Sequence, residues 1–330
     1  VVGGDLLPAG AGRDTVNGFW TSARHEVLSI TRARIALLLL MVFVGMVSVS
    51  AIIGWITTRT VTSVYEGILA AGLTAAPNPF TDVAPLYYAR NSAIYVVLIG
   101  CLMAIVLGAQ ATLRDRKQGT SILVLTRPLA IQARLLGQLA GIGLVLATVS
   151  LVSTLISWVS IAIITGTPLG GDLTARLVGF AGTSWLLLMV FAIIGMISGL
   201  FARRESTAFL VPFVVWSGIT FVLPQLGSAA RPVALLNPVP AVPVAGDSFS
   251  VLSALTGPLA ITEQFKTTAS VLLQNDLVVG SAGAGVLVLA IFLAEGQCDR
   301  CLGQLVAQVK GVGRIELGRR VHIGRAAKAR

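Results

Sequence analysis

The sequence predicts an all-α polytopic membrane protein with six transmembrane helices. Hydrophobic residues make up 55% of the 330 residues and charged residues only 12%, against roughly 25% charged in a soluble domain. The mean hydropathy is +0.88. A soluble chain of this length needs more polar surface to cover a single core, so the excess apolar surface is expected to face lipid.

Six apolar stretches reach or approach the roughly 20 residues that cross a hydrocarbon core of about 30 Å. They cover residues 35–57, 92–112, 138–164, 177–201, 207–226 and 277–294. The third is long enough to tilt, and the sixth is the shortest. We therefore expect a flexible N-terminus at 1–18, a six-helix transmembrane domain at 19–294, and a basic cytoplasmic tail at 295–330.

The basic residues predict the orientation of these spans. Nineteen of the 24 Lys and Arg residues fall in segments 1–34, 113–137, 202–206 and the tail from 295, and five fall in the remaining loops. Positive charge concentrates on the cytoplasmic side of membrane proteins. The sequence thus predicts a multi-pass cell-membrane protein with both termini in the cytoplasm. The net charge of +10 is interpreted as topological, and no nucleic acid partner is expected.

An amphipathic helix is predicted ahead of the first span. Its apolar positions recur at steps of three and four residues: Phe19, Trp20, Ala23, Val27 and Ile30. Arg24, His25 and Glu26 occupy the other side. This pattern is typical of a helix on the inner membrane surface, with Trp20 at the interface. The alternative is a simple extension of the first span.

The outside loops are predicted at 58–91 and 227–276. The second is rich in proline and contains apolar pieces too short to span, such as 251–261. Such pieces suit re-entrant or interfacial helices, and an ordered external cap is an equal alternative.

The sequence offers little chemistry of its own. The six predicted spans contain no Asp, Glu, Lys, Arg or His, whereas ion-coupled carriers usually need ionisable groups there. The chain has no G-x-x-x-x-G-K-[ST] phosphate loop, no H-E-x-x-H and no G-x-S-x-G. We therefore expect no catalytic site, cofactor or metal in this chain. Cys298 and Cys301 form one C-x-x-C, interpreted as reduced cytosolic thiols, with a metal or redox role as the alternative.

The most specific segment is the first large cytoplasmic loop. It begins with the charged residues Arg114, Asp115 and Arg116. Gly119 permits a turn, and Thr120 can cap a short helix whose apolar side includes Leu123. Arg127 and Pro128 close that helix. This pattern predicts a short cytoplasmic coupling helix between the second and third spans, able to dock on a soluble partner.

The loop resembles that of the permease subunits of type 2 ABC transporters. Their loop reads G-T-L-x-x-L-L-S-x-P-[VI]-[ST]-R after a charged, Glu-rich start, and L-x-G-K follows. The matching places here are Gly119-Thr120, residues 123–126, Pro128 and Leu136-Gly137-Gln138. Within the family the chain most resembles the subgroup that includes the permease of nitrous oxide reductase maturation. It departs from the pattern at Lys117 and Gln118, where an acidic residue is usual, and at Gln138, where Lys is usual.

The resemblance implies a half-transporter. Two permease copies, alike or different, would pair in lipid with two separate cytoplasmic ABC ATPase subunits, which bind ATP and Mg. The expected ATPase-docking residues are Arg114, Asp115, Arg116, Gly119, Thr120, Leu123, Arg127 and Pro128, with Trp20, Arg24 and Glu26 in the surface helix. Uncharged spans suggest a lipid-like, peptide or hydrophobic cargo, or a mechanical role. The alternative functions are a non-transporting scaffold or sensor and a passive channel.

Overall fold

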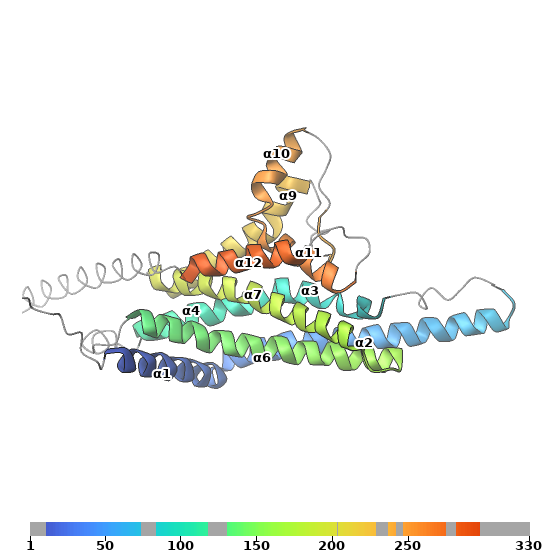
Figure 1. Ribbon diagram of the computed structural model, residues 1–330, viewed down its shortest axis with the longest axis horizontal. Helices are drawn as coiled ribbons and strands as arrows, with labels where there is room; N and C mark the ends of the chain where they lie inside the picture. The colour runs from blue at the N-terminus through green and yellow to red at the C-terminus, as the bar shows by residue number, and fades with distance from the viewer. Residues whose placement is uncertain are drawn as a thin grey trace, which may run out of the picture.

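The computed structural model describes residues 11–73, 84–117, 131–202, 204–228, 237–241, 247–274 and 282–297. All regular secondary structure in these residues is helical, which confirms the predicted all-α class. The longest helices lie side by side along the long axis of the molecule (Figure 1).

The first half of the chain forms two long helices and a composite third. Helix α1 spans Ala11–Arg32 and α2 spans Arg34–Ala70. A 3-10 turn, η1 (Pro85–Ala89), then leads into α3 (Ser92–Tyr95), the π-helical η2 (Val96–Gly100) and α4 (Cys101–Lys117).

The second half contains two further long helices and several shorter ones. Helix α6 spans Ile131–Thr165 and α7 spans Gly171–Phe201. Helix α8 (Glu205–Ser217) continues through the π-helical η3 (Gly218–Val222) into α9 (Leu223–Ser228). The last three helices are α10 (Asp247–Thr256), α11 (Ile261–Leu272) and α12 (Ala282–Gln297).

Five helical stretches of the described chain are long and apolar enough to cross a membrane. They cover 34–70, 85–114, 133–165, 171–201 and 205–226, and each contains most or all of one of the first five predicted spans. The chain is therefore a multi-pass membrane protein. The predicted sixth span falls on α12, where the apolar part of the helix covers only 283–294, so its crossing stays a prediction.

Helix α2 is longer than the predicted first span. Its 37 residues extend over about 55 Å, well beyond a hydrocarbon core of about 30 Å. The predicted outside loop at 58–91 therefore begins as helix, because the chain meets no helix breaker before Gly72, which has a φ of +68°. Figure 1 shows α2 running past the other long helices at one end.

Helix α1 is separate from α2. Ala33 between them has an extended backbone, with φ −82° and ψ 112°. The N-terminal helix is thus not an extension of the first span, which was the alternative from sequence. It begins at Ala11, inside the segment at 1–18 that was expected to be flexible.

The core of the bundle is the contact between α4 and α7. Leu187, Leu188 and Phe191 of α7 are fully buried. A Cβ added at Gly195 would lie 2.3 Å from the Ile105 carbonyl oxygen, and one at Gly108 would lie 2.1 Å from the Ala192 carbonyl oxygen. The two backbones approach this closely only because these residues are glycines.

Helix α11 belongs to the bundle. Ile261, Phe265 and Ala269 are buried, and α11 packs against α7 and α12. A Cβ at Gly285 of α12 would lie 1.9 Å from Thr268 Oγ1. This part of segment 227–276 is therefore a helix packed against the long helices, and the choice between a re-entrant or interfacial helix and an external cap stays a prediction.

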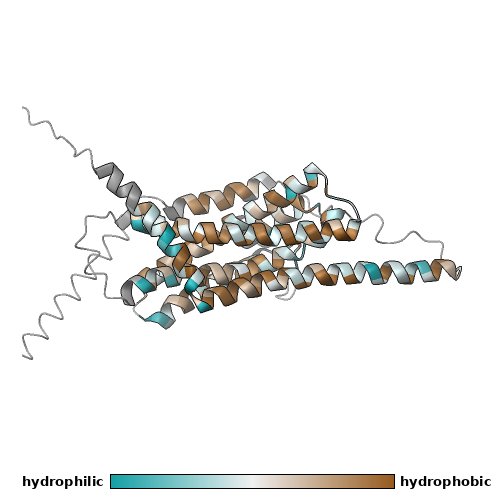
Figure 2. Cartoon of the chain, turned by 90° about the horizontal axis from the view of Figure 1, so that it is seen from below, coloured by the Kyte–Doolittle hydropathy of each residue, from teal (hydrophilic) through white to brown (hydrophobic). Residues whose placement is uncertain are grey.

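The polar residues lie mainly toward the ends of the long helices. Figure 2 shows hydrophobic colouring along the long helices, and hydrophilic residues near the end that carries α1 and on the distal part of α2. The C-terminal ends of α4 and α12 and the start of α6 lie at the α1 end (Figure 1). The helix ends that border the predicted inside segments therefore lie at the same end of the molecule. The side of the membrane that this end faces stays a prediction.

Candidate functional site

The structure joins the two regions that sequence analysis selected for partner docking. Glu26 of α1 and Arg114 near the end of α4 form an ion pair. Glu26 is only 1% exposed, and the Arg114 side chain is about a quarter exposed. Burying one charge without the other is costly, so the pair fixes α1 to α4.

Helix α1 lies on a glycine saddle of α6, which we define as Gly137 and Gly141. A Cβ at Gly137 would lie 2.6 Å from the Phe19 carbonyl oxygen, and one at Gly141 would lie 2.6 Å from the Ala23 carbonyl oxygen. The two glycines are one turn apart on α6, so they form a continuous surface for α1. Together with the Glu26–Arg114 pair, the saddle joins α1, α4 and α6 into one unit.

The buried face of α1 differs from the predicted apolar face. Ala23, Glu26 and Ile30 are buried, at helical spacing, whereas Trp20 is 67% exposed. Glu26 was assigned to the polar side from sequence, and that assignment is wrong. The reason is its pairing with Arg114, which makes the burial of a carboxylate tolerable.

The other predicted site residues are distributed as follows. Trp20 and Arg24 lie exposed on α1, where the Trp20 ring contacts Phe19 edge to face, with centroids 5.4 Å apart. The backbones of Asp115 and Arg116 belong to α4. The side chains of these two residues lie outside the described part of the chain, as do Gly119, Thr120, Leu123, Arg127 and Pro128, and the tail from Cys298 onward, which includes Cys301.

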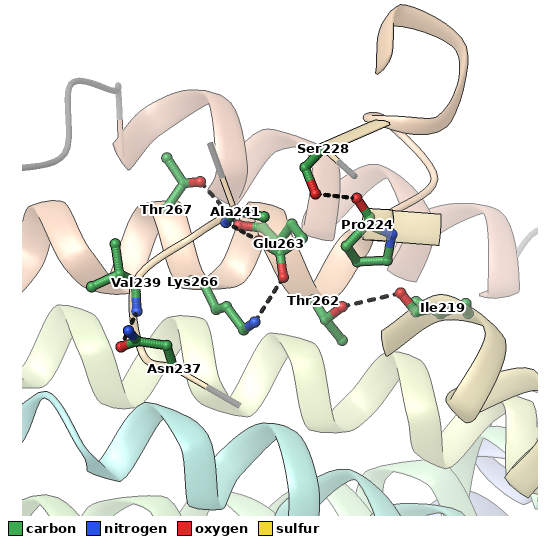
Figure 3. Close-up of polar contacts among 10 residues, drawn as sticks. All are labelled: Ile219, Pro224, Ser228, Asn237, Val239, Ala241, Thr262, Glu263, Lys266 and Thr267. Atoms are coloured by element: carbon green, nitrogen blue, oxygen red, sulfur yellow. Dashed lines mark hydrogen bonds and ion pairs between the residues drawn. The ribbon is translucent and has the colours of Figure 1, made fainter. Parts of the chain in front are cut away.

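A second polar cluster, formed by Glu263 and Lys266 of α11 (Figure 3), was not anticipated. Lys266 Nζ donates to Glu263 Oε1 at 2.7 Å, and Glu263 Oε2 accepts from the Ala241 backbone N–H at 2.9 Å. Thr262 Oγ1 donates to the Ile219 carbonyl oxygen at 3.3 Å. Sequence analysis had placed Lys266 in an outside loop, yet it is only 2% exposed.

Arg90 fixes the other end of α11. Its guanidinium donates to the carbonyl oxygens of Leu273 and Gln274, just beyond the last turn. Together with the Thr262–Ile219 and Ala241–Glu263 hydrogen bonds, this arginine positions α11 within the bundle. The sequence signal that could have indicated the cluster is the Glu–Lys spacing of three residues in an otherwise weakly polar segment.

Among the residues whose placement is described, no group of three or more His, Cys, Asp or Glu side chains is close enough to hold a metal ion. The Glu26–Arg114 ion pair connects α1 with α4, whereas the Glu263–Lys266 ion pair lies within α11.

A comparison with known protein families shows the family of this chain. The model of the ABC-2 family transporter proteins matches residues 20–294. The chain belongs to this ABC-2 transporter family. The family resemblance from sequence is therefore confirmed, and the subgroup stays a prediction. No curated protein matches the chain.

The matched range runs from Trp20 in α1 to Ala294 in α12, so the ABC-2 family region includes α1 from Trp20 onward and all five span-length stretches. Proteins of this family are membrane components of ABC transporters and are generally non-catalytic. The ABC-2 chain is accordingly a permease component.

Proposed function

We propose that this ABC-2 chain is the permease subunit of an ATP-driven transporter, in a cell membrane with both termini in the cytoplasm. A separate ATPase binds ATP and Mg, and two permease copies assemble with two ATPase subunits. The observation that carries the proposal is the family match, supported by the ion pair that links α1 to the end of α4.

The joined helices α1, α4 and α6 transmit motion of the ATPase to the membrane helices. The segment between Lys117 and Ile131 connects α4 to α6, and an ATPase bound there acts on both helices at once. Because α1 is attached to both, it moves with them. Closure of the ATPase dimer then biases the bundle between two states, provided that the ATPase binds one state better.

The exposed apolar faces support an assembly in lipid. In the most apolar part of α2 only 17% of residues are buried within the chain, and in the stretch 205–226 only 22%. A second permease copy and lipid together cover these faces in the proposed complex. We expect a lipid-like, peptide or hydrophobic substrate, or a mechanical role, because the predicted spans contain no charged residue.

The test is reconstitution of the complex with its ATPase and measurement of ATP hydrolysis and transport. We expect Glu26→Gln and Arg114→Gln each to lower the rate at least about tenfold, because each leaves a buried or half-buried partner unpaired. The exchange E26R/R114E restores much of the rate by re-forming the pair with reversed charges.

Arg176→Gln is the matched control, since Arg176 pairs with Asp172 at an exposed site on α7. Such a pair contributes little, so this variant keeps its rate within about twofold. Two results would contradict the proposal: full rates in both single variants, or a permease that purifies from its native membrane with no ATP-hydrolysing subunit.

A further inference from the structure

A hydroxyl-lined cleft lies inside the bundle, away from both ion-pair clusters. Five serines from three helices line it: Ser92 of α3, Ser150, Ser153 and Ser157 of α6, and Ser184 of α7. Each of these serines is at most 8% exposed. Phe43 and Val47 of α2 form part of the apolar wall opposite.

Two of these hydroxyls lack a partner. A buried serine in a helix ordinarily donates to a carbonyl one turn back, and Ser157 and Ser184 do so, to the carbonyl oxygens of Ser153 and Phe180 at 3.1 and 2.7 Å. Ser150 Oγ and Ser153 Oγ have no hydrogen-bond partner within the described part of the chain. A buried hydroxyl without a hydrogen-bond partner is unfavourable, so these two groups are suited to a ligand.

The lining determines the chemistry of that ligand. The cleft is lined by serine, threonine and apolar side chains, with no charged residue among the lining residues that the structure describes. A hydroxyl both donates and accepts, so it matches another hydroxyl or a water molecule. A charged ligand would have to lose its hydration with no countercharge, which is unfavourable in such a site.

The size of the cleft limits what enters. It holds about 340 Å³ including its open mouth, but the enclosed part has room for about one water molecule. Thr154 lines the cleft and is half-buried, and its neighbours Leu151 and Leu155 expose their side chains on α6. An end group can therefore occupy the enclosed part while an apolar chain lies along this exposed face.

We propose that this serine cleft binds the hydroxyl group of an uncharged amphiphile, whose alkyl chain lies on the α6 face of Leu151 and Leu155. The hydroxyl takes the place of a water molecule and bonds to Ser150 and Ser153. Binding of the amphiphile to the cleft does not require the ATPase. A role of the cleft in a transport path rests on the proposed function.

The experiment uses the full chain in lipid nanodiscs, with no ATPase present. A decanol that carries a photoreactive diazirine on its chain is activated by light, and the labelled peptides are identified by mass spectrometry. We expect labelling concentrated on α6 around Leu151 and Leu155, where the alkyl chain is placed. Excess 1-decanol should reduce that labelling at least about fivefold, whereas decane, decanoate and decyltrimethylammonium should not. An even distribution over the lipid-facing helices, or equal competition by decane, would overturn the proposal.

The variant S150A/S153A separates binding from folding. Since neither hydroxyl has a partner among the residues that the structure describes, the variant keeps its thermal midpoint or gains stability, while the specific labelling falls at least about fivefold. Thr148→Ala, on the exposed face of the same helix, is the matched control and keeps both properties. A marked loss of stability in S150A/S153A would overturn the proposal, because it would mean that the two hydroxyls bond within the protein.

Discussion

Single glycines decide how closely the helices of this bundle approach. Gly108, Gly195 and Gly199 lie where α4 meets α7, and each would place a Cβ within 2.3 Å of an atom of the other helix. In lipid the hydrophobic effect between helices is absent, so close packing contributes a large part of their association. These positions are therefore expected to tolerate substitution poorly.

Two glycines of α7 give a matched test of that expectation. Gly195→Ala places a methyl group against the backbone of α4, which cannot move aside as a side chain can. We expect a loss of about 1–3 kcal/mol in unfolding free energy. Gly182→Ala meets nothing within 4 Å and should be neutral or stabilising by up to about 1 kcal/mol. Thermal unfolding of both variants in detergent measures this, and equal midpoints would show that the α4–α7 contact is looser than described.

At the residue scale, the sequence indicated several important side chains but did not indicate the contacts between them. Glu26 and Arg114 were both selected, but their contact joins positions 88 residues apart, which no local periodicity encodes. Lys266 was assigned to a loop because hydropathy treats a lysine as exposed. Its burial depends on Glu263, three residues away, and on packing that only the assembled bundle provides.

At the scale of elements, two π-helical segments are connected by a tryptophan. Trp216 precedes η3, and its Nε1–H donates to the Val97 carbonyl oxygen in η2 at 3.0 Å. In η3 the Ile219 carbonyl oxygen accepts from Thr262 of α11. A π segment disturbs the regular backbone ladder, so carbonyl groups there are available to side chains. These two bonds join α8, η2 and α11.

Removal of the indole N–H tests this connection. Trp216→Phe keeps an aromatic ring between Phe213 and Phe221 but loses the bond to Val97. We expect a loss of about 0.5–1.5 kcal/mol from the missing bond, with a smaller added loss from the reduced ring area. Trp20→Phe, at an exposed position of α1, is the control and should change the unfolding free energy little. Equal effects of the two substitutions, measured by chemical denaturation, would count against the connection.

The first five spans were predictable because a run of about 20 apolar residues has few alternatives to a membrane helix. Their ends were less predictable. Hydropathy indicates where a helix leaves the lipid, but the helix itself continues until a residue such as Gly72 breaks it. Helix α2 therefore continues to Ala70. The piece at 251–261, recognised only as too short to span, overlaps α10, and α11 was not recognised as a helix. Their places in the fold depend on tertiary contacts.

At the scale of the whole molecule, the charge distribution and the helix ends lead to one orientation. The segments that carry most of the Lys and Arg residues lead from the end of the bundle that holds α1, and the distal part of α2 projects at the opposite end (Figure 1). The positive-inside rule assigns the α1 end to the cytoplasm. The distal part of α2 should then lie outside.

Two cysteine variants test that orientation in intact cells. In a background with Cys298 and Cys301 replaced by Ser, and with Cys101 left because it is buried, Ser63→Cys and Arg32→Cys are introduced singly. Ser63 lies 29 positions after Arg34 in α2, or about 44 Å along the helix, which exceeds a hydrocarbon core of about 30 Å. We expect a membrane-impermeant maleimide to label the cysteine at 63 in intact cells.

Arg32 ends α1 and is exposed, so a cysteine there should react only after the membrane is permeabilised. The background variant without an introduced cysteine measures any reaction of Cys101 and should remain unlabelled. The reverse pattern would place the α1 end outside, and it would also remove the proposed ATPase site from the compartment that supplies ATP. The orientation and the proposed function therefore depend on the same labelling result, because α1 and the end of α4 must face the side from which an ATPase can reach them.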